Sequence, residues 1–410
     1  MLQPVPLAQK HLSDYASIVG RPLVDEIRLL ADRLAGRKIL HLSATAFGGG
    51  VSEILYTLVP LMVDVGLNCE WQVIYGREEF FNATKVMHNA LQGNPLDLSE
   101  EQWQTWTDYN EINARELSEG WDLCIVHDPQ PAAVCQMAGH KADQWVWRCH
   151  IDLSTPNADT LARLAPYLNC YPDAVFHMPG YVPEGISGRP HILPPAIDPL
   201  APKNMAFAPD DAVYICEQFG IDVDRPLLCQ VSRFDPWKDP LGVIDAYRLV
   251  KQEIPEIQLA LVGSMATDDP EGWDYFNATV SHAEGDPDIH LLNNLNNVGA
   301  IEVNAFQSHC DVVIQKSIRE GFGLTVSEAI WKARPFVGGN VGGIPLQVTD
   351  GESGFLVSSP GECAQRCLEI LRDPGLGRRL GRAGKETVRH RFLTPRLLRD
   401  WLVLMDGALG

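Results

Sequence analysis

The chain has little positive charge. Its 410 residues include 33 Lys and Arg against 53 Asp and Glu, which gives a formal net charge of −20. Nucleic-acid phosphates and anionic lipid surfaces attract clusters of Lys and Arg. We therefore expect neither a nucleic acid nor a membrane surface as a partner, and any anionic ligand must be bound by individual cations in an acidic background.

The sequence also lacks cysteine pairs and long apolar runs. The ten cysteines are scattered and include no C-x-x-C motif. The first residues, MLQPVPLAQKHLSDYAS, do not have the charged-then-apolar layout of a signal peptide. The longest apolar run, ILYTLVPLMVDVGL, is broken by Asp64 and is too short to span a bilayer. Scattered thiols without such a signal are typical of a reducing compartment, so we expect a cytoplasmic protein.

Short apolar runs alternate with amphipathic segments through most of the chain. Strands that alternate with helices favour parallel sheets covered on both faces, so the predicted fold class is α/β. The runs expected to be buried strands are 38–44, 69–76, 121–128, 145–151, 173–178, 226–234, 257–264, 288–294, 311–317 and 335–340.

A stretch rich in Pro and Gly over residues 180–225 separates two such halves. A single core stops growing at roughly 250–300 residues, so two domains are expected. We place them at 1–202 and 203–390, each doubly wound and Rossmann-like, with ligands bound at the carboxyl ends of the strands. The last segment, about 391–410, is predicted to be an amphipathic helix that packs back on the first domain.

The motif SIREGFGLTVSEA contains two carboxylates, Glu320 and Glu328, eight positions apart. Such proximity suggests a glycosidase acid/base pair, yet eight residues on one helix are rotated by roughly 80°. A glycine turn between them favours two separate positions along a ligand. Backbone N–H groups of Gly323, Leu324 and Thr325 at the start of the following helix suit a phosphate. A capped helix with a solvent-exposed Glu is the alternative.

A second loop, VSRFDPWKDP, follows another predicted strand and offers Arg233 and Lys238. A planar guanidinium together with a flexible ammonium suits a diphosphate, on which negative charge grows as a leaving group departs. The alternative is a solvated loop with ordinary charges.

The first half offers a glycine loop, TAFGGGVSE, directly after its first strand, with Gly49 and Gly50 at the start of a helix. The loop is neither a G-x-G-x-x-G fingerprint nor a Walker loop. It could face a diphosphate or a sugar, or it could be a plain helix cap.

In WRCHIDLSTPN, Arg148, His150 and Asp152 alternate, so a strand would place all three on one face. Polar groups buried without partners cost several kcal/mol. They could form a closed salt-bridge network or line a pocket for a hydroxyl-rich acceptor. No H-x-x-x-H, Cys/His cluster or strand-terminal D-x-D motif stands out, and we expect no metal site.

Taken in order, R-x4-K, LVGS, EGFGLTVSE, VGGIP and DGESGFLV resemble the retaining glycosyltransferases of the GT-B fold over residues 226–360. Together with LSATAFGGGVSEIL, HDPQP, WRCHIDLS and LPPAIDPL, the pattern is similar to that of trehalose glycosyltransferring synthases over roughly residues 35–395. Retaining trehalose phosphorylases share much of it.

This resemblance implies a GT-B fold, with two doubly wound Rossmann-like domains and a deep cleft between them. It also implies roles for single residues. Arg233 and Lys238 would bind the donor diphosphate, Glu320 the hydroxyls of the transferred sugar and Glu328 the ribose. His127, at the end of a strand in VHDPQP, would contact the donor sugar, with a buried structural histidine as the alternative.

The reaction implied is reversible transfer of glucose from a nucleoside-diphosphate-glucose to free glucose, which forms trehalose with retention of configuration. No cofactor or metal is expected, the attack is from the front face, and the family resemblance implies a homodimer. Three alternatives stay open: a retaining trehalose phosphorylase that uses inorganic phosphate, a nucleotide-sugar epimerase of GT-B fold, and a catalytically silent nucleotide-sugar sensor. The base of the donor nucleotide is not predicted.

Overall fold

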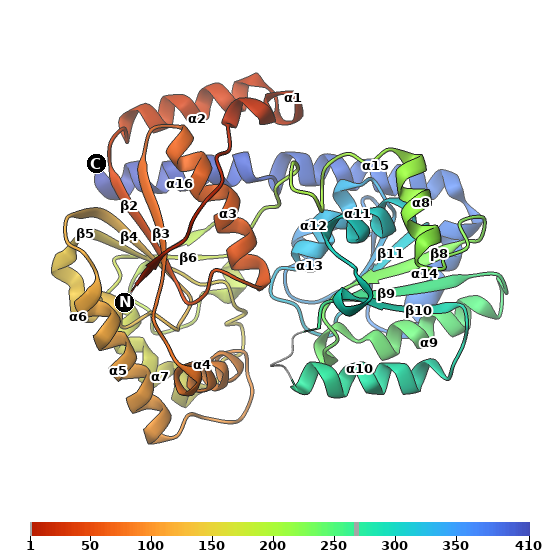
Figure 1. The fold of residues 1–410 in the computed structure, drawn as a ribbon, viewed down its shortest axis with the longest axis horizontal. Coiled ribbons are helices and arrows are strands. Elements are labelled where there is room, and N and C mark those ends of the chain that lie inside the picture. Colours follow the sequence, from red (N-terminus) through yellow and green to blue (C-terminus); the bar gives the residue numbers. More distant parts are fainter. Residues whose placement is uncertain (1, 266–269) are drawn as a thin grey trace. The chain divides into compact units, whose positions relative to one another are not determined.

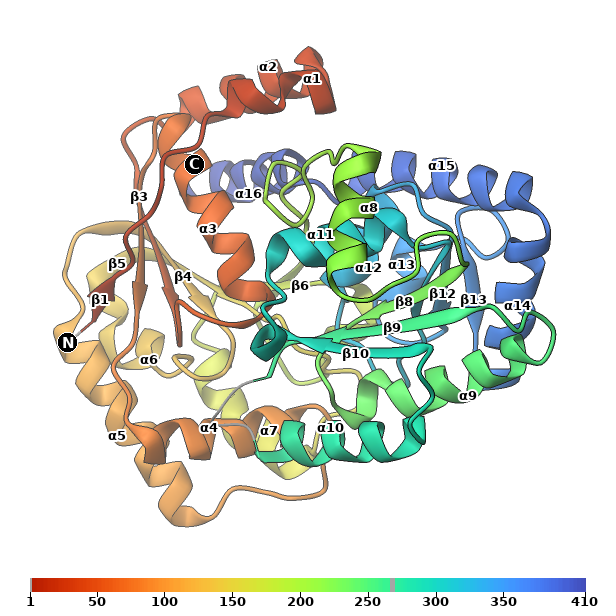
Figure 2. The same cartoon turned by 45° about the vertical axis from the view of Figure 1, so that its right-hand side comes forward.

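The computed structural model describes residues 2–265 and 270–410 and divides the chain into two units (Figure 1). Unit 1 comprises Met1–Ala196 together with Thr394–Gly410, and unit 2 comprises Ile197–Leu393. The helices and strands of each unit can be followed from a second direction in Figure 2.

The proline-rich segment that follows residue 196 is part of unit 2, because its backbone is hydrogen-bonded there. The side-chain amide of Asn304 donates to the carbonyl oxygens of Pro202, at 2.9 Å, and Met205, at 3.0 Å. Unit 2 therefore begins earlier in the chain than residue 203, the predicted start of the second domain.

The described residues of unit 1 form a seven-stranded sheet in the order β1-β3-β2-β4-β5-β6-β7. Neighbouring strands are parallel except β1 and β3, which are antiparallel. Because β2, β4 and β5 are adjacent and parallel, the segments that follow them emerge at the same edge of the sheet. The strands are β1 (Gln3–Pro4), β2 (Lys38–Ser43), β3 (Asn68–Val73), β4 (Trp121–His127), β5 (Ala142–Arg148), β6 (Asp173–Phe176) and β7 (Arg189–Ile192).

Helices cover both faces of this sheet, and the core between the layers is rich in Leu, Ala and Trp. The C-terminal helix α16 packs against α2 and α3, and α5 packs against α4 and α6. In Figure 1 these two groups lie on opposite sides of the sheet. The helices are α1 (Ala16–Val19), α2 (Arg21–Arg33), α3 (Gly49–Asp64), α4 (Glu78–Leu91), α5 (Glu100–Glu116), α6 (Val134–Ala138), α7 (Ala158–Leu168) and α16 (Thr394–Leu409), with 3-10 turns at Leu12–Tyr15, Gly139–Lys141 and Pro179–Tyr181.

The described residues of unit 2 form a second sheet, of six parallel strands, in the order β10-β9-β8-β11-β12-β13. The order reverses between β8 and β11, and this is where a doubly wound sheet binds its ligand. The strands are β8 (Leu227–Val231), β9 (Gln258–Gly263), β10 (Ile289–Asn293), β11 (Val312–Gln315), β12 (Phe336–Gly339) and β13 (Phe355–Val357).

The helices of unit 2 cover both faces of its sheet around an apolar core. Helix α9 packs on α10 and α14, and α8 packs on α11. The helices are α8 (Pro209–Gln218), α9 (Pro240–Lys251), α10 (Pro270–Ala283), α11 (Ala300–His309), α12 (Leu324–Trp331), α13 (Ile344–Gln347), α14 (Pro360–Arg372) and α15 (Pro374–Arg391), with 3-10 turns η4 (Pro236–Lys238) and η5 (Asn294–Asn296).

All ten predicted strand segments overlap a strand of the structure, whereas β1, β7 and β13 were not predicted. These three are only two to four residues long, and β1 and β7 contain proline, which weakens the strand signal. Among the described helices, none is long and apolar enough to cross a membrane.

Candidate active site

In unit 2, the EGFG turn joins β11 to α12 at the position where the strand order reverses. Gly323 precedes the first residue of α12 and has a φ of +79°, which glycine adopts without strain. The first-turn N–H groups of α12, those of Leu324 and Thr325, have no acceptor within the helix. The turn thus presents backbone donors and the positive end of a helix, which together suit an anion.

A buried glutamine from the neighbouring helix α13 holds this turn in place. Gln347 Nε2 donates to the carbonyl oxygens of Phe322, at 2.6 Å, and Gly323, at 3.3 Å. Gly343 N–H donates to the carbonyl oxygen of Gly321 at 3.0 Å. A Cβ atom on Gly343 would lie 2.7 Å from that same oxygen, so only glycine fits here. The VGGIP segment therefore binds the carbonyl side of the turn and leaves its N–H side for a ligand.

The structure brings Lys238 and Glu320 together, from the loops after β8 and β11. Lys238 Nζ lies 2.7 Å from Glu320 Oε2, and Ser317 Oγ donates to the same carboxylate oxygen at 3.3 Å. The two loops are also joined through their backbones, because Ile318 N–H donates to the Trp237 carbonyl oxygen at 2.8 Å. A cation and a carboxylate are thus fixed beside the α12 N-terminus.

Arg233 belongs to the same loop as Lys238 but is much more exposed. Its side chain is 66% accessible and lies 3.2 Å from the carboxylate of Asp235. Asp235 in turn accepts hydrogen bonds from the N–H groups of Trp237, at 2.9 Å, and Lys238, at 3.1 Å. The loop conformation is therefore stabilised by Asp235, and the guanidinium is accessible to an anionic ligand.

Glu328 lies in the second turn of α12, and only 2% of its side chain is exposed. Its Oε1 lies 3.7 Å from Nζ of Lys203, a residue of the proline-rich segment. Glu320 and Glu328 thus lie near different cationic side chains, Lys238 and Lys203.

In unit 1, the glycine loop after β2 has two residues in the left-handed region, Gly48 with a φ of +71° and Gly49 with a φ of +80°. A Cβ atom at either position would meet no other atom within 4 Å, so space does not require glycine here. The left-handed backbone does, because other residues adopt it only with strain. Helix α3 begins at Gly49 and Gly50, and Ser52 Oγ donates to the carbonyl oxygens of Gly48 and Gly49. The loop therefore opens a helix N-terminus, where the sequence predicted a ligand-facing turn.

Strand β5 ends at Arg148, so the prediction that Arg148, His150 and Asp152 share one face of a strand is wrong. The N–H of His150 donates at 2.7 Å to the side-chain Oδ1 of Asp128, the residue that follows β4, and the backbone ladder between β4 and β5 ends there. Asp152 Oδ1 accepts from the N–H of Ser154 at 2.8 Å, which makes a local turn. His150 and Asp152 therefore lie on the loop after β5.

Asp128 is half-buried, its backbone is in the left-handed region with a φ of +66°, and sequence reasoning did not identify it. Burial raises the pKa of its carboxyl to about 7, although the His150 N–H bond and the nearby Arg148 charge both act to lower it. A raised pKa in a loop at the carboxyl ends of strands is typical of functional sites. In the motif HDPQP, Asp128 directly follows His127, the residue for which the sequence predicted a role.

Three histidines follow one another across β2, β4 and the loop after β5. His41 Nδ1 lies 2.9 Å from His127 Nε2, and His127 Nδ1 lies 2.9 Å from His150 Nε2. Burial lowers the pKa of all three, that of His41 to about 3. Both ring nitrogens of His127 are engaged by other histidines, which corresponds to the buried structural alternative rather than to a sugar contact.

Arg148 is almost fully buried between these groups, and burial lowers its pKa to about 10. Its NH2 donates to the carbonyl oxygen of Leu193 at 2.8 Å. Its NH1 has no hydrogen-bond partner in the described part of the chain. A closed network, one of the two alternatives for these residues, is therefore incomplete at Arg148, and a buried cationic donor is left for a further acceptor.

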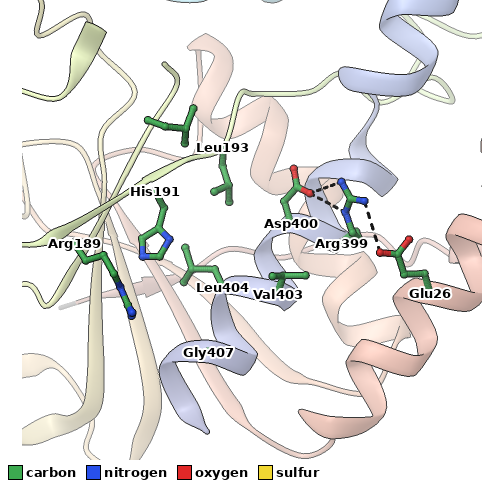
Figure 3. Close-up of a pocket in the computed structure, with 10 residues that line it drawn as sticks. Glu26, Arg189, His191, Leu193, Arg399, Asp400, Val403, Leu404 and Gly407 are labelled. Atoms are coloured by element: carbon green, nitrogen blue, oxygen red, sulfur yellow. Dashed lines mark hydrogen bonds and ion pairs between the residues drawn. The ribbon is translucent and has the colours of Figure 1, made fainter. Parts of the chain in front are cut away.

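A cavity of about 480 Å³ lies elsewhere in unit 1, between β7, α2 and α16 (Figure 3). Its charges are paired: Arg399 bonds Asp400 at 2.7 Å and lies 3.7 Å from Glu26, and Arg189 bonds Asp173, outside the lining, at 2.7 Å. None of the predicted site residues lines this cavity. Over residues 2–265 and 270–410, no group of three or more His, Cys, Asp or Glu is arranged to hold a metal ion.

Each unit matches a different family model. Residues 41–183 match trehalose synthase, N-terminal domain, and residues 215–387 match glycosyl transferases group 1. Among solved structures, an α,α-trehalose-phosphate synthase (UDP-forming) from Burkholderia xenovorans in complex with glucose-6-phosphate aligns with a TM-score of 0.71 at 13% identity, covering 91% of this chain and 100% of that one. The two doubly wound units therefore have the GT-B fold, and the chain is a hexosyltransferase, as the sequence predicted.

The relatives specify the family. A trehalose synthase from Rubrobacter xylanophilus is 58% identical over 417 residues, with 100% of each chain covered. A trehalose synthase from Pyrococcus horikoshii is 45% identical over 405 residues, which cover 98% of this chain and 97% of the relative. The chain belongs to the trehalose synthase family.

Sequence reasoning missed His41 and Gln347 as well as Asp128. His41 is a single imidazole in the apolar strand KILHLS, and a polar side chain in such a strand requires a partner. Gln347 follows the quoted VGGIP motif by two positions and is fully buried. In both cases the signal was a lone polar residue in an apolar context, but the partner that gives it a role is distant in sequence.

Proposed function

We propose that this enzyme transfers glucose from a nucleoside-diphosphate-glucose to free glucose, with retention of configuration, and so forms trehalose in a reversible reaction. The observation that carries the proposal is the Lys238–Glu320 pair, 2.7 Å apart, beside the N-terminus of α12. It supports the proposal because one group suited to a phosphate and one suited to sugar hydroxyls could then bind adjacent parts of a single ligand. The names of the two full-length relatives support trehalose as the product.

The diphosphate would be bound by Arg233, Lys238 and the first N–H groups of α12. Charge on the departing phosphate grows in the transition state, and fixed donors aimed at it lower the barrier. Two cations and a helix N-terminus can supply this stabilisation, so we infer that transfer requires no divalent ion. Glu328 would accept from the ribose hydroxyls, in place of or together with its contact to Lys203.

Glu320 would orient the donor sugar and would not act as a nucleophile. Its Oε2 already accepts from Lys238 and Ser317, which fixes the carboxylate and lowers its nucleophilicity. In the front-face route, the acceptor hydroxyl attacks the anomeric carbon on the side from which the diphosphate leaves. The bond from that carbon to the phosphate oxygen breaks, and the departing oxygen takes the proton of the acceptor hydroxyl.

In unit 1, the sugar hydroxyls would be hydrogen-bonded by Arg148, His150 and Asp128. Arg148 NH1 is a buried donor with no acceptor among the described residues, and His150 is only half-buried. A site built to hydrogen-bond sugar hydroxyls discriminates strongly against analogues that lack them, because its buried groups are then left unpaired. Gly49 and Gly50, at the start of α3, would allow close approach of the ligand to the backbone.

The test is incubation with glucose and, separately, ADP-, UDP- and GDP-glucose, scored for a non-reducing disaccharide. We expect trehalose from at least one donor, released with the free nucleoside diphosphate and unaffected by EDTA. Trehalose cleavage that depends on inorganic phosphate and not on a nucleoside diphosphate would replace this function by a phosphorylase. Nucleotide release without glucose, or donor binding without turnover over a panel of acceptors, would instead indicate an epimerase or a sensor.

The double-displacement alternative has its own test. A slow 2-fluoro donor is incubated with the enzyme, and the intact protein is weighed by mass spectrometry. We expect no covalent adduct. A glycosyl group trapped on Glu320 would overturn the front-face route while leaving the overall transfer reaction unaffected.

A further inference from the structure

The row of histidines in unit 1 connects a buried strand with the loop after β5. His41 lies in β2, His127 is the last residue of β4, and His150 lies two residues beyond the end of β5. Successive ring centroids are 5.2 Å apart, with interplanar angles of 26° and 20°. His41 is fully buried, His127 is 2% exposed and His150 is half-buried, so the row leads from the core to the surface of the unit.

The three rings are neutral in the native state. Burial lowers the pKa of each, and the Arg148 cation lowers the pKa of His127 and His150 further. A neutral imidazole has one N–H donor and one bare acceptor nitrogen. Because His127 uses both of its nitrogens in the row, it must donate through one and accept through the other. The row therefore has a direction, and only two arrangements of its protons are possible.

The buried end of the row distinguishes between the two arrangements. His41 Nε2 is buried and has no hydrogen-bond partner in the described part of the chain. If the row ran from His150 to His41, this nitrogen would carry an orphaned N–H, which is rare in native structures. A perpendicular contact with Trp401, at 6.1 Å between ring centroids, would offset only part of that cost. If the row runs from His41 to His150, only a lone pair is unsatisfied.

We propose that His41 is a positioning residue which, through His127, fixes the tautomer of His150 so that its Nδ1 carries the proton. His41 Nδ1–H donates to His127 Nε2, and His127 Nδ1–H donates to His150 Nε2. In this arrangement His150 presents an N–H donor at the half-buried end of the row. The ligand served by that donor is a sugar hydroxyl oxygen or an anionic oxygen, and this assignment rests on the proposed glucosyl transfer; the direction of the row does not.

The direct test reads the tautomer in the free protein. Enzyme with 15N-labelled histidine is recorded in long-range 1H–15N spectra, in which Nδ1–H and Nε2–H rings give different patterns, and His150→Gln identifies the His150 signals. We expect His150 to carry its proton on Nδ1. A wild-type His150 protonated on Nε2 would overturn the proposal whatever the variants do. Because this spectrum needs no substrate, it separates failure of the proposal from failure of the proposed function.

Two substitutions of His41 test whether it sets the tautomer. His41→Phe keeps an aromatic ring beside Trp401 but removes both nitrogens, whereas His41→Asn keeps a hydrogen-bonding group near the position of Nδ1. With His41→Phe we expect signals of both His150 tautomers, and with His41→Asn the wild-type pattern. His290→Phe, which removes an imidazole from β10 of unit 2, is the matched control and should leave the His150 signals unchanged.

The same variants give a kinetic test. His41→Phe should lower kcat by about five- to tenfold, the effect of one hydrogen bond, with the KM for the nucleotide donor changed by less than about twofold. His41→Asn should recover most of that loss. An unchanged tautomer and an unchanged kcat in a folded His41→Phe enzyme would show that His41 has a packing role only.

Discussion

Lys238 Nζ lies 2.7 Å from Glu320 Oε2, and both side chains are largely buried, with 17% and 7% of their surface exposed. The cation suited to the donor phosphate is thus held by the carboxylate suited to the donor sugar. Under the proposed function, a bound diphosphate would share Lys238 with Glu320. Removal of a partner from a buried pair costs more than the pair itself contributes, because a charge is left uncompensated. Substitutions at this pair should therefore preserve shape and hydrogen bonding.

Glu320→Gln meets that requirement, since the amide oxygen can still accept from Lys238. We expect kcat to fall by about 100-fold, because an interaction made mainly in the transition state is lost. Donor affinity should change by less than about threefold. Initial rates and titration calorimetry with the nucleotide donor measure the two effects separately. Weaker donor binding with an unchanged kcat would contradict the assigned role.

Glu328→Gln should have the opposite profile. Loss of charge at a ribose contact should raise the donor Kd by about 10- to 100-fold and leave kcat at saturating donor within about threefold of the wild type. Glu352→Gln removes a carboxylate from an exposed position of the same unit and serves as the matched control. If both Glu320→Gln and Glu328→Gln lowered kcat equally, with donor affinity intact, the two carboxylates would have to be reinterpreted as an acid/base pair.

The sequence alone was sufficient for the α/β class, ten of the strands and the EGFGLT turn, because each depends on local patterns. The boundary of unit 2 was predicted too late, because Pro202 and Met205 are bound by Asn304, about a hundred residues further on. Likewise, WRCHIDLS alternates like a strand, but the Asp128 side chain takes the N–H of His150 and the strand ends. Such long-range hydrogen bonds leave no local pattern.

The same limit applies to the residues that complete the site. The sequence showed EGFGLT and VGGIP as two separate motifs. Their contact through Gly343 and Gly321 depends on β11 and β12 being neighbours in the sheet. His41 was visible as an isolated polar residue, but its partner His127 lies in a different strand. The sequence could therefore predict which segments form turns at the ends of strands more reliably than which atoms meet.

Asp128 should make stability depend on pH. Burial raises the pKa of this carboxyl from 3.8 to about 7. The native state thus holds the proton to a higher pH than the unfolded chain does, and the contribution of this group to the free energy of unfolding falls as the pH rises between those values. Above about pH 7 that contribution no longer changes with pH.

Asp128→Asn removes this titration and retains an oxygen that can accept from the His150 N–H. We expect the Tm of the variant, relative to the wild type, to rise as the pH is raised from about 4 to about 7 and then to level off. The buried histidines, with lowered pKa values, make stability change in the opposite direction over part of this range. Comparison of both proteins in the same buffers cancels that contribution. A Tm difference that is independent of pH would contradict the raised pKa.

Gly343→Ala tests whether the VGGIP segment supports the donor turn. The added Cβ would lie 2.7 Å from the carbonyl oxygen of Gly321 and 2.7 Å from the Cα of Phe322. Both are backbone atoms, so the turn must shift, and we expect a loss of about 1–3 kcal/mol in the free energy of unfolding. The affinity for the nucleoside diphosphate alone should fall as well, because the first N–H groups of α12 move with the turn.

Gly361→Ala is the matched control, since a Cβ there meets no atom within 4 Å and its φ is not in the left-handed region. In the first turn of α14 alanine should be neutral or slightly stabilising, as expected for the replacement of a helical glycine. Thermal unfolding and calorimetric titration with the nucleoside diphosphate compare the two variants. Loss of stability in Gly343→Ala with unchanged diphosphate affinity would mean that the contact stabilises unit 2 without positioning the donor turn. If the VGGIP segment positions a phosphate-binding turn, Gly343→Ala should lose both stability and diphosphate affinity, and Gly361→Ala should lose neither.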